Sequence, residues 1–116
     1  MHAPLTDATR AIINEDALNS MKPSAYLINV ARAELVDEKA LAEAVMKGKI
    51  AGAGVDVFSK EPVTMDNPLL GVKSERLLFS PHVAGVTDEA AGRIINMAAA
   101  NIARALKGEK PESLLN

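Results

Sequence analysis

The chain has 116 residues, of which 48% are hydrophobic and 24% charged, with 13 basic and 15 acidic side chains. This length is typical of one globular domain, and a net charge of −2 argues against nucleic acid or an anionic membrane as a partner. The absence of cysteine excludes disulfides, thiolate metal sites and cysteine nucleophiles. Because the sequence contains neither a membrane-length apolar run nor a signal-peptide pattern, we expect a cytoplasmic protein.

The first half of the sequence predicts a helix, a strand and a second helix, over residues 14–21, 25–30 and 37–48. Asn14 and Asp37 are suitable N-caps, because their side-chain oxygens can accept hydrogen bonds from free helical amides. Pro23 has no amide hydrogen and cannot continue the first helix, whereas Gly48 suits the end of the second. The apolar run between the helices has no helical period, which indicates a strand buried on both faces.

The second half predicts a strand, a helical turn, a further strand and a long helix, over residues 53–58, 68–70, 77–80 and 87–107. Gly108 and Pro111 end the long helix, whose apolar residues fall on one face. Short apolar strands that alternate with helices indicate an α/β fold with about three parallel strands and flanking helices. The crossover between the first two strands should be right-handed.

Three chemically active side chains each follow one predicted strand: Arg32, Glu61 and His82. Ligands of open α/β sheets bind beyond the carboxyl ends of the strands, so these residues can meet in one crevice. Histidine can donate a proton near neutral pH, a neighbouring carboxylate favours its charged form, and arginine offers a planar fork to a carboxylate. The set suits reduction of a 2-oxo acid.

Each of these residues also has an ordinary structural explanation. Arg32 can be a solvated surface residue, Glu61 can belong to a turn with Pro62, and His82 can be a hydrogen-bonded loop histidine. Asp56, late in an apolar strand, can accept a hydrogen bond from a cofactor or merely cap a loop. The segment 52–54 (Gly-Ala-Gly) lacks the third glycine of a dinucleotide fingerprint and enters a strand instead of leaving one, so close packing explains it better.

Over almost the entire chain the sequence resembles the D-isomer-specific 2-hydroxyacid dehydrogenases, of the phosphoglycerate dehydrogenase and glyoxylate/hydroxypyruvate reductase type. The similarity covers the C-terminal half of their cofactor-binding domain. The segments that carry it are His2–Thr6 with Thr9, Met21–Lys22, Asn29–Arg32, Leu35–Glu38 with Ala40–Leu41, Gly52–Phe58, Glu61–Pro62, Asn67–Leu69 and Ser80–His82.

The resemblance implies a role for each matched residue. Arg32 would bind the substrate's carboxylate and carbonyl, His82 would be the catalytic acid and base, and Glu61 would be its partner. Asp56 would hydrogen-bond the nicotinamide carboxamide of NAD or NADP. The remaining cofactor contacts implied are Ala3, Val30, Ala31, Arg32, His82, Val83, Ala84 and Gly85. The implied substrate is a small 2-oxo or 2-hydroxy acid, with no metal.

Two features depart from the family pattern. Ala33 replaces the glycine that normally follows the arginine, which would cost roughly 1 kcal/mol if that position needs a positive φ. The 116 residues also contain no G-x-G-x-x-G. We therefore expect residues 1–116 to be the C-terminal part of a dinucleotide-binding domain, with a partial Rossmann-like fold, a long C-terminal helix and no second domain.

These expectations lead to two functional hypotheses. In the first, the chain is a fragment of an NAD(P)-dependent oxidoreductase that interconverts a D-2-hydroxyacid and a 2-oxo acid by hydride transfer, and is inactive alone. Whether it is an enzyme by itself is therefore left open. The alternative is a non-enzymatic remnant that acts in self-association or protein interaction, because exposed apolar faces and a strand edge invite pairing. A homo-oligomer is expected in either case.

Overall fold

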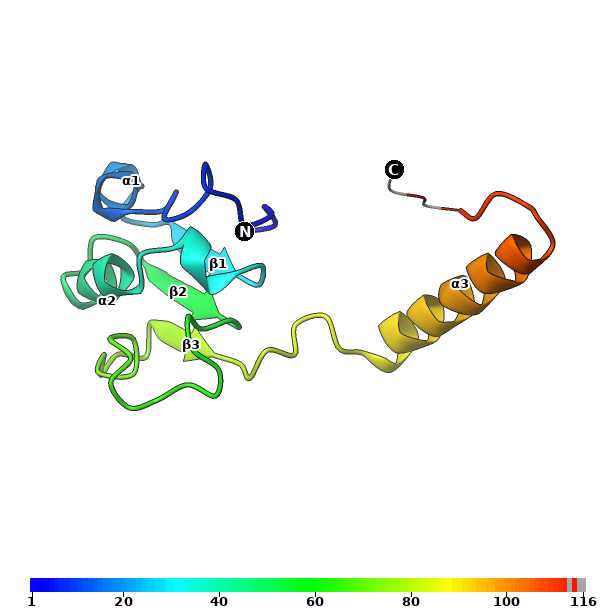
Figure 1. Cartoon of the computed structure of the whole chain (residues 1–116). Helices are drawn as coiled ribbons and strands as arrows, with labels where there is room; N and C mark the ends of the chain where they lie inside the picture. The colour runs from blue at the N-terminus through cyan, green and yellow to red at the C-terminus, as the bar shows by residue number, and fades with distance from the viewer. Residues whose placement is uncertain (113, 115–116) are drawn as a thin grey trace. The chain divides into compact units, whose positions relative to one another are not determined.

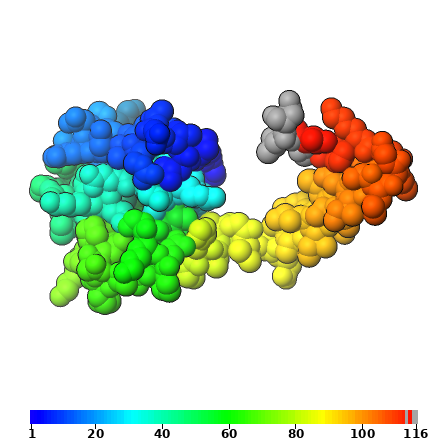
Figure 2. All heavy atoms as spheres, in the orientation of Figure 1, coloured from blue at the N-terminus to red at the C-terminus, as the bar shows by residue number. Residues whose placement is uncertain are grey.

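The structure, a computed structural model, describes residues 1–112 and 114 and divides into two compact units, Met1–Ala84 and Gly85–Asn116. The space-filling view in Figure 2 shows the first unit, coloured blue to green, as a closely packed body. Its elements, labelled in Figure 1, are α1 (Glu15–Ser20), β1 (Tyr26–Asn29), a 3₁₀ turn (Ala33–Leu35), α2 (Glu38–Met46), β2 (Gly52–Val55) and β3 (Leu77–Phe79). The second unit contains α3 (Asp88–Leu106).

The three strands form one parallel sheet in the order β1-β2-β3. Ile28 is paired with Gly54, which is paired in turn with Leu78. The prediction of an α/β fold with three parallel strands and helices is confirmed. The carboxyl ends of all three strands consequently lie along one edge of the sheet, where residues that follow them can approach one another.

The expectation that β1 is buried on both faces is wrong. Leu27 and Asn29 are buried, whereas Tyr26 and Ile28 on the other face are 68% and 51% exposed. Helices α1 and α2 contribute their apolar side chains to one core, and that core lies against a single face of the sheet. The apolar run over residues 25–30 therefore did not show whether one face or both faces of the strand are buried.

The core of the first unit explains why these segments fold as they do. Asn14 caps α1 by accepting a hydrogen bond from the Ala17 amide at 2.9 Å, and Asp37 caps α2 through the Ala40 amide at 3.0 Å, as predicted. Gly48 follows α2 at φ +66°, a conformation that glycine adopts without strain. Side chains from both helices and the loops fill the interior: Leu18, Leu35, Leu41, Val45, Ile50 and Leu69.

Helix α3 confirms the predicted long helix to within a residue at each end. Thr87 caps it by accepting a hydrogen bond from the Ala90 amide at 3.1 Å. None of its side chains is buried, and its apolar residues are largely exposed, including Ile94, Ile95, Ile102 and Leu106. In the described part of the chain, no helix combines the length and apolar character needed to cross a membrane.

Candidate functional site

The structure brings His82 and Glu61 into direct contact. His82 lies three residues beyond β3, and its Nδ1 is 2.8 Å from Oε2 of Glu61. The other carboxylate oxygen of Glu61, Oε1, accepts a hydrogen bond from the Phe58 amide at 3.0 Å. Both side chains keep substantial exposure, 52% for His82 and 39% for Glu61, so a small molecule can reach them.

The charge of Glu61 is favoured by its contacts. The hydrogen bond with His82 and the one from the Phe58 amide lower the pKa of Glu61 below its ordinary value of 4.5. Glu61 is therefore ionised at neutral pH and favours a proton on Nδ1 of His82. That arrangement directs the second ring nitrogen, Nε2, away from the carboxylate and makes it the nitrogen available for proton transfer.

Asp56 fixes the turn that carries His82. Its Oδ1 accepts hydrogen bonds from the Ser80 hydroxyl and from the Val83 amide at 2.9 Å, and its Oδ2 accepts one from the Ala84 amide at 3.0 Å. Burial opposes ionisation of this carboxyl, but the three hydrogen bonds and the nearby His82 outweigh it, so the pKa of Asp56 lies below its ordinary value of 3.8. The turn holds His82 at φ +55°, a strained conformation that needs such support.

The predicted end of the second strand needs a correction that bears on Asp56. The strand was expected to run over 53–58, but β2 ends at Val55 and Asp56 is the first residue beyond it. The carboxylate is 3% exposed and lies at the ligand-facing edge of the sheet, where its cost of burial is met by the three donors.

Arg32 is held by a separate local network at the end of β1. The buried side chain of Asn29 donates to the Arg32 carbonyl at 2.9 Å and accepts from the Ala31 amide at 3.2 Å, which fixes the backbone on both sides of the arginine. The exposed guanidinium donates to the Ala31 carbonyl at 2.6 Å. In the described residues no hydrogen bond or ion pair joins Arg32 to Glu61 or His82, so the contact pair is His82–Glu61 alone.

Ala33 does not carry the strain considered from the sequence. It begins the 3₁₀ turn and is buried, and the positive φ values at described non-glycine residues occur at Ala11 and His82. The backbone after Arg32 thus has a shape that alanine adopts without a steric penalty.

Four of the predicted cofactor residues line one open groove of about 600 Å³: Ala3, Val30, Ala31 and Arg32, together with His2, Pro4 and Leu5. Small apolar walls beside one cation suit a flat nicotinamide ring and an anionic substrate, so the residues present fit NAD or NADP. Val83 and Ala84 lie at the Asp56 carboxylate instead. Gly85 is the first residue of the second unit.

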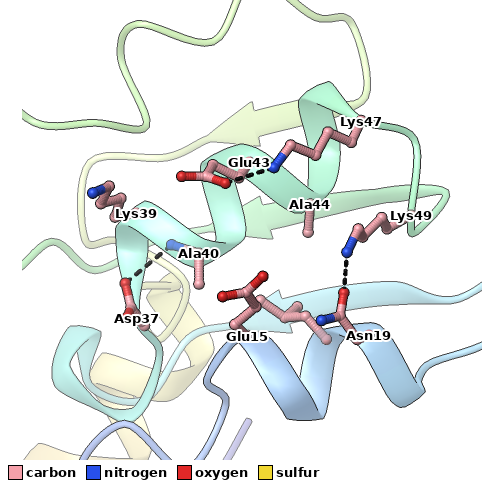
Figure 3. Close-up of a pocket in the computed structure, with 10 residues that line it drawn as sticks. Glu15, Asn19, Asp37, Lys39, Ala40, Glu43, Ala44, Lys47 and Lys49 are labelled. Carbon is pink, nitrogen blue, oxygen red and sulfur yellow. Dashed lines mark hydrogen bonds and ion pairs between the residues drawn. The ribbon is translucent and has the colours of Figure 1, made fainter.

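A second hollow, of about 220 Å³, contains none of the predicted site residues. Figure 3 shows it between α1 and α2, where Glu43 and Lys47 form an ion pair and Lys49 donates a hydrogen bond to Asn19. Its polar side chains largely satisfy one another, which is typical of a solvated helix–helix groove.

Three residues whose hydrogen bonds support the site were not identified from the sequence as functional. Ser80 binds Asp56, Asn29 shapes the backbone at Arg32, and Glu38 binds the loop that carries Glu61. Asparagine at the end of a strand, two residues before a turn amide, is a recognisable signal. Ser80 and Asp56 directly follow neighbouring parallel strands, so the argument that brings residues to one edge of the sheet could have paired them. Glu38 has no such signal, because it begins a helix and its partners lie in a loop.

We expect the contact between Glu61 and His82 to make the stability of the fold depend on pH, and Glu61→Gln should reduce this dependence. Because the pKa of Glu61 is lower in the folded chain than its ordinary 4.5, the pair stabilises the fold above that pH, and this stabilisation is lost as pH falls through the lowered value. The urea midpoint, followed by fluorescence of the single tyrosine, Tyr26, should fall less in the variant than in wild type on acidification. Glu75→Gln, at an exposed carboxylate, is the control. Equal acid sensitivity of wild type and Glu61→Gln would contradict the contact.

Comparison with known proteins identifies the family. The pattern of the "D-isomer specific 2-hydroxyacid dehydrogenase, NAD binding domain" matches residues 1–84, the same range as the first compact unit. The chain belongs to this family. The glyoxylate reductase of Thermofilum pendens is 46% identical over all 116 residues, which are 34% of its own length. The chain thus spans about a third of the length of this curated relative.

Solved structures of dehydrogenases agree with the family assignment and with the cofactor. The D-lactate dehydrogenase of Lactobacillus jensenii, solved with NAD⁺, matches 99% of this chain and 38% of its own, with a TM-score of 0.87 and 29% identity. A D-isomer specific 2-hydroxyacid dehydrogenase of Xanthobacter autotrophicus Py2, solved with NADPH, matches 99% of this chain and 46% of its own, with a TM-score of 0.76 and 36% identity. The predicted Rossmann-like fold and the cofactor class, NAD or NADP, are confirmed.

Proposed function

We propose that the chain carries the catalytic residues of an NAD(P)-dependent D-2-hydroxyacid dehydrogenase, which interconverts a small 2-oxo acid and the corresponding D-2-hydroxyacid. The observation that carries the proposal is the 2.8 Å contact between His82 and Glu61 at the carboxyl edge of the sheet. Residues 1–116 are then the C-terminal part of the dinucleotide-binding domain. The absence of nucleic-acid and membrane partners and the cytoplasmic location stay predictions.

Three side chains divide the chemistry among them. In the direction of reduction, the guanidinium of Arg32 binds the substrate carboxylate and polarises the adjacent ketone oxygen. His82 gives the proton on Nε2 to that oxygen, so a new O–H bond forms while the imidazolium becomes neutral. Glu61 stays ionised at Nδ1, which keeps the ring oriented with Nε2 toward the substrate. In the direction of oxidation His82 takes the proton back.

When bound, the reduced nicotinamide supplies the hydride that becomes the new C–H bond at the former carbonyl carbon. Ala3, Val30 and Ala31 would line its groove. Asp56 would accept a hydrogen bond from the carboxamide. Its Oδ2 takes one amide donor in the structure, and a carboxylate oxygen can accept a second.

The proposal is tested in a chimera in which this chain replaces the corresponding third of the Thermofilum pendens glyoxylate reductase, to which all 116 residues align. The chimera should oxidise NADH or NADPH in the presence of glyoxylate. The 116-residue polypeptide alone should turn over well below about 1 per second, an ordinary enzyme rate, because its sequence has no glycine-rich phosphate loop. A folded but inactive chimera would contradict the proposed function.

Self-association is the second candidate function, and helix α3 is the observation that favours it. Burying exposed side chains such as Ile94, Ile95 and Ile102 is worth about 1.5–3 kcal/mol each. The helix begins with two acidic residues, and Arg104 lies in its basic last turn. An antiparallel pair of α3 helices from two copies therefore brings opposite charges together while it covers the apolar face.

This pairing predicts a homodimer at tens of micromolar in sedimentation equilibrium. Ile102→Asp should shift the chain toward monomer, because a charge would lie in the apolar contact. Ala100→Asp places the same side chain on the opposite face of the helix and should leave the dimer unchanged. A wild-type chain that sediments as a clean monomer would contradict self-association.

A further inference from the structure

One carboxylate outside the reacting pair binds both ends of the loop that carries Glu61. Glu38 is the first residue of α2, and its Oε1 accepts a hydrogen bond from the Ser59 amide at 3.0 Å. Its Oε2 accepts one from the Ser59 hydroxyl at 2.6 Å and another from Nδ2 of Asn67 at 3.0 Å. Ser59 and Asn67 are the first and last residues of the segment that contains Glu61.

These bonds are the main polar connection between this loop and the rest of the first unit. Within the described residues, the hydrogen bonds from segment 59–67 to distant segments are the three at Glu38 and the contact of Glu61 with His82. Asn67 is 9% exposed, and its Oδ1 accepts from the amide of the core residue Leu69 at 3.0 Å. One end of the loop is therefore fixed to the core, and Glu38 ties the other end to it.

We propose that Glu38 is a positioning residue for the His82–Glu61 pair: it acts through Ser59 and Asn67 to hold the Glu61 carboxylate at Nδ1 of His82. The inference rests on the proposed function of that pair. Glu61 lies two residues from Ser59, and its carboxylate also caps the Phe58 amide at the same end of the loop. A shift of this end would break the contact with His82, since a charged hydrogen bond weakens steeply beyond its normal length.

The imidazole of His82 reports this positioning directly. Ionised Glu61 at Nδ1 favours the tautomer with the proton on Nδ1, whereas an isolated imidazole favours Nε2. The ring ¹⁵N chemical shifts distinguish the two tautomers of a neutral imidazole, so the spectra are recorded at alkaline pH. The full chain contains only two histidines, and His2→Ala assigns their signals.

Glu61→Ala sets the scale of the experiment, because it removes the contact outright and should convert His82 to the ordinary tautomer. Glu38→Ala should move the His82 signals at least half of the way to those of Glu61→Ala. Glu38→Gln should restore part of the wild-type spectrum, since its carbonyl can still accept from the Ser59 amide. Glu43→Ala is the matched control: it removes a glutamate from the same helix that pairs with Lys47, and should leave His82 unchanged.

The results separate the positioning role of Glu38 from the His82–Glu61 pair itself. If Glu61→Ala shifts His82 and Glu38→Ala does not, the positioning role is wrong while the catalytic pair stands. If Glu61→Ala itself leaves His82 unchanged, the pair fails, and the role of Glu38 with it. Should Glu38→Ala fail to fold, as judged by circular dichroism, Ser59→Ala decides the question. It removes one of the three bonds and should give a smaller shift in the same direction, and no shift would overturn the inference.

Discussion

His82→Gln should lower kcat/KM of the chimera for glyoxylate by about 10²–10⁴-fold, the usual contribution of a general acid or base. Glutamine fills a similar volume and can still donate a hydrogen bond to Glu61. It cannot release a proton to the ketone oxygen. The loss should therefore fall mainly on kcat, because Arg32 still binds the substrate carboxylate.

The steady-state assay for this prediction measures NADH oxidation against glyoxylate concentration. Glu43→Gln is an appropriate control, because it changes an exposed carboxylate on α2 that pairs with Lys47 and not with His82 or Glu61. A His82→Gln chimera with more than a tenth of the parent kcat would show that His82 is not the proton donor. A rise in KM alone would instead indicate a role in binding.

Much of the fold could be predicted because its signals are local. The predicted caps at Asn14 and Asp37 each depend on a side chain and an amide three residues apart. The apolar periodicity that predicts α3 likewise lies within one continuous segment of the sequence. Parallel pairing followed from alternation of short strands with helices. What the periodicity could not decide was which face of β1 is covered, because that depends on packing between distant segments.

The candidate site also contains contacts that the sequence could predict and contacts that it could not. His82 and Glu61 could be paired in advance, because residues that follow neighbouring parallel strands are brought to one edge. The support from Glu38 could not, because Glu38 begins a helix and meets Ser59 and Asn67 only through the closure of the loop that follows β2. Asp56 was predicted as a functional candidate, but its hydrogen bonds with the Val83 and Ala84 amides depend on the shape of the turn after β3.

Asp56→Asn should cost the first unit about 1–3 kcal/mol of unfolding free energy, the cost of an unsatisfied donor, and should also disorganise the turn that holds His82. An asparagine keeps one oxygen in place of two and turns an amide group toward the donors of the turn, so a partly buried N–H or O–H loses its acceptor. The φ of +55° at His82 is then no longer held by bonds on either side of the residue.

Urea unfolding followed by the fluorescence of Tyr26, which lies in β1 of the first unit, measures the loss. The sign of its pH dependence is fixed by the lowered pKa of Asp56: the stabilisation is present above the ordinary value of 3.8 and disappears as pH falls through the lower folded value. The difference between wild type and Asp56→Asn should therefore shrink on acidification. Asp7→Asn, at an exposed residue, should stay within about 0.5 kcal/mol of wild type. If Asp56→Asn is equally neutral at pH 7, the carboxylate does not anchor the turn, and another feature of the chain must hold His82 against Glu61.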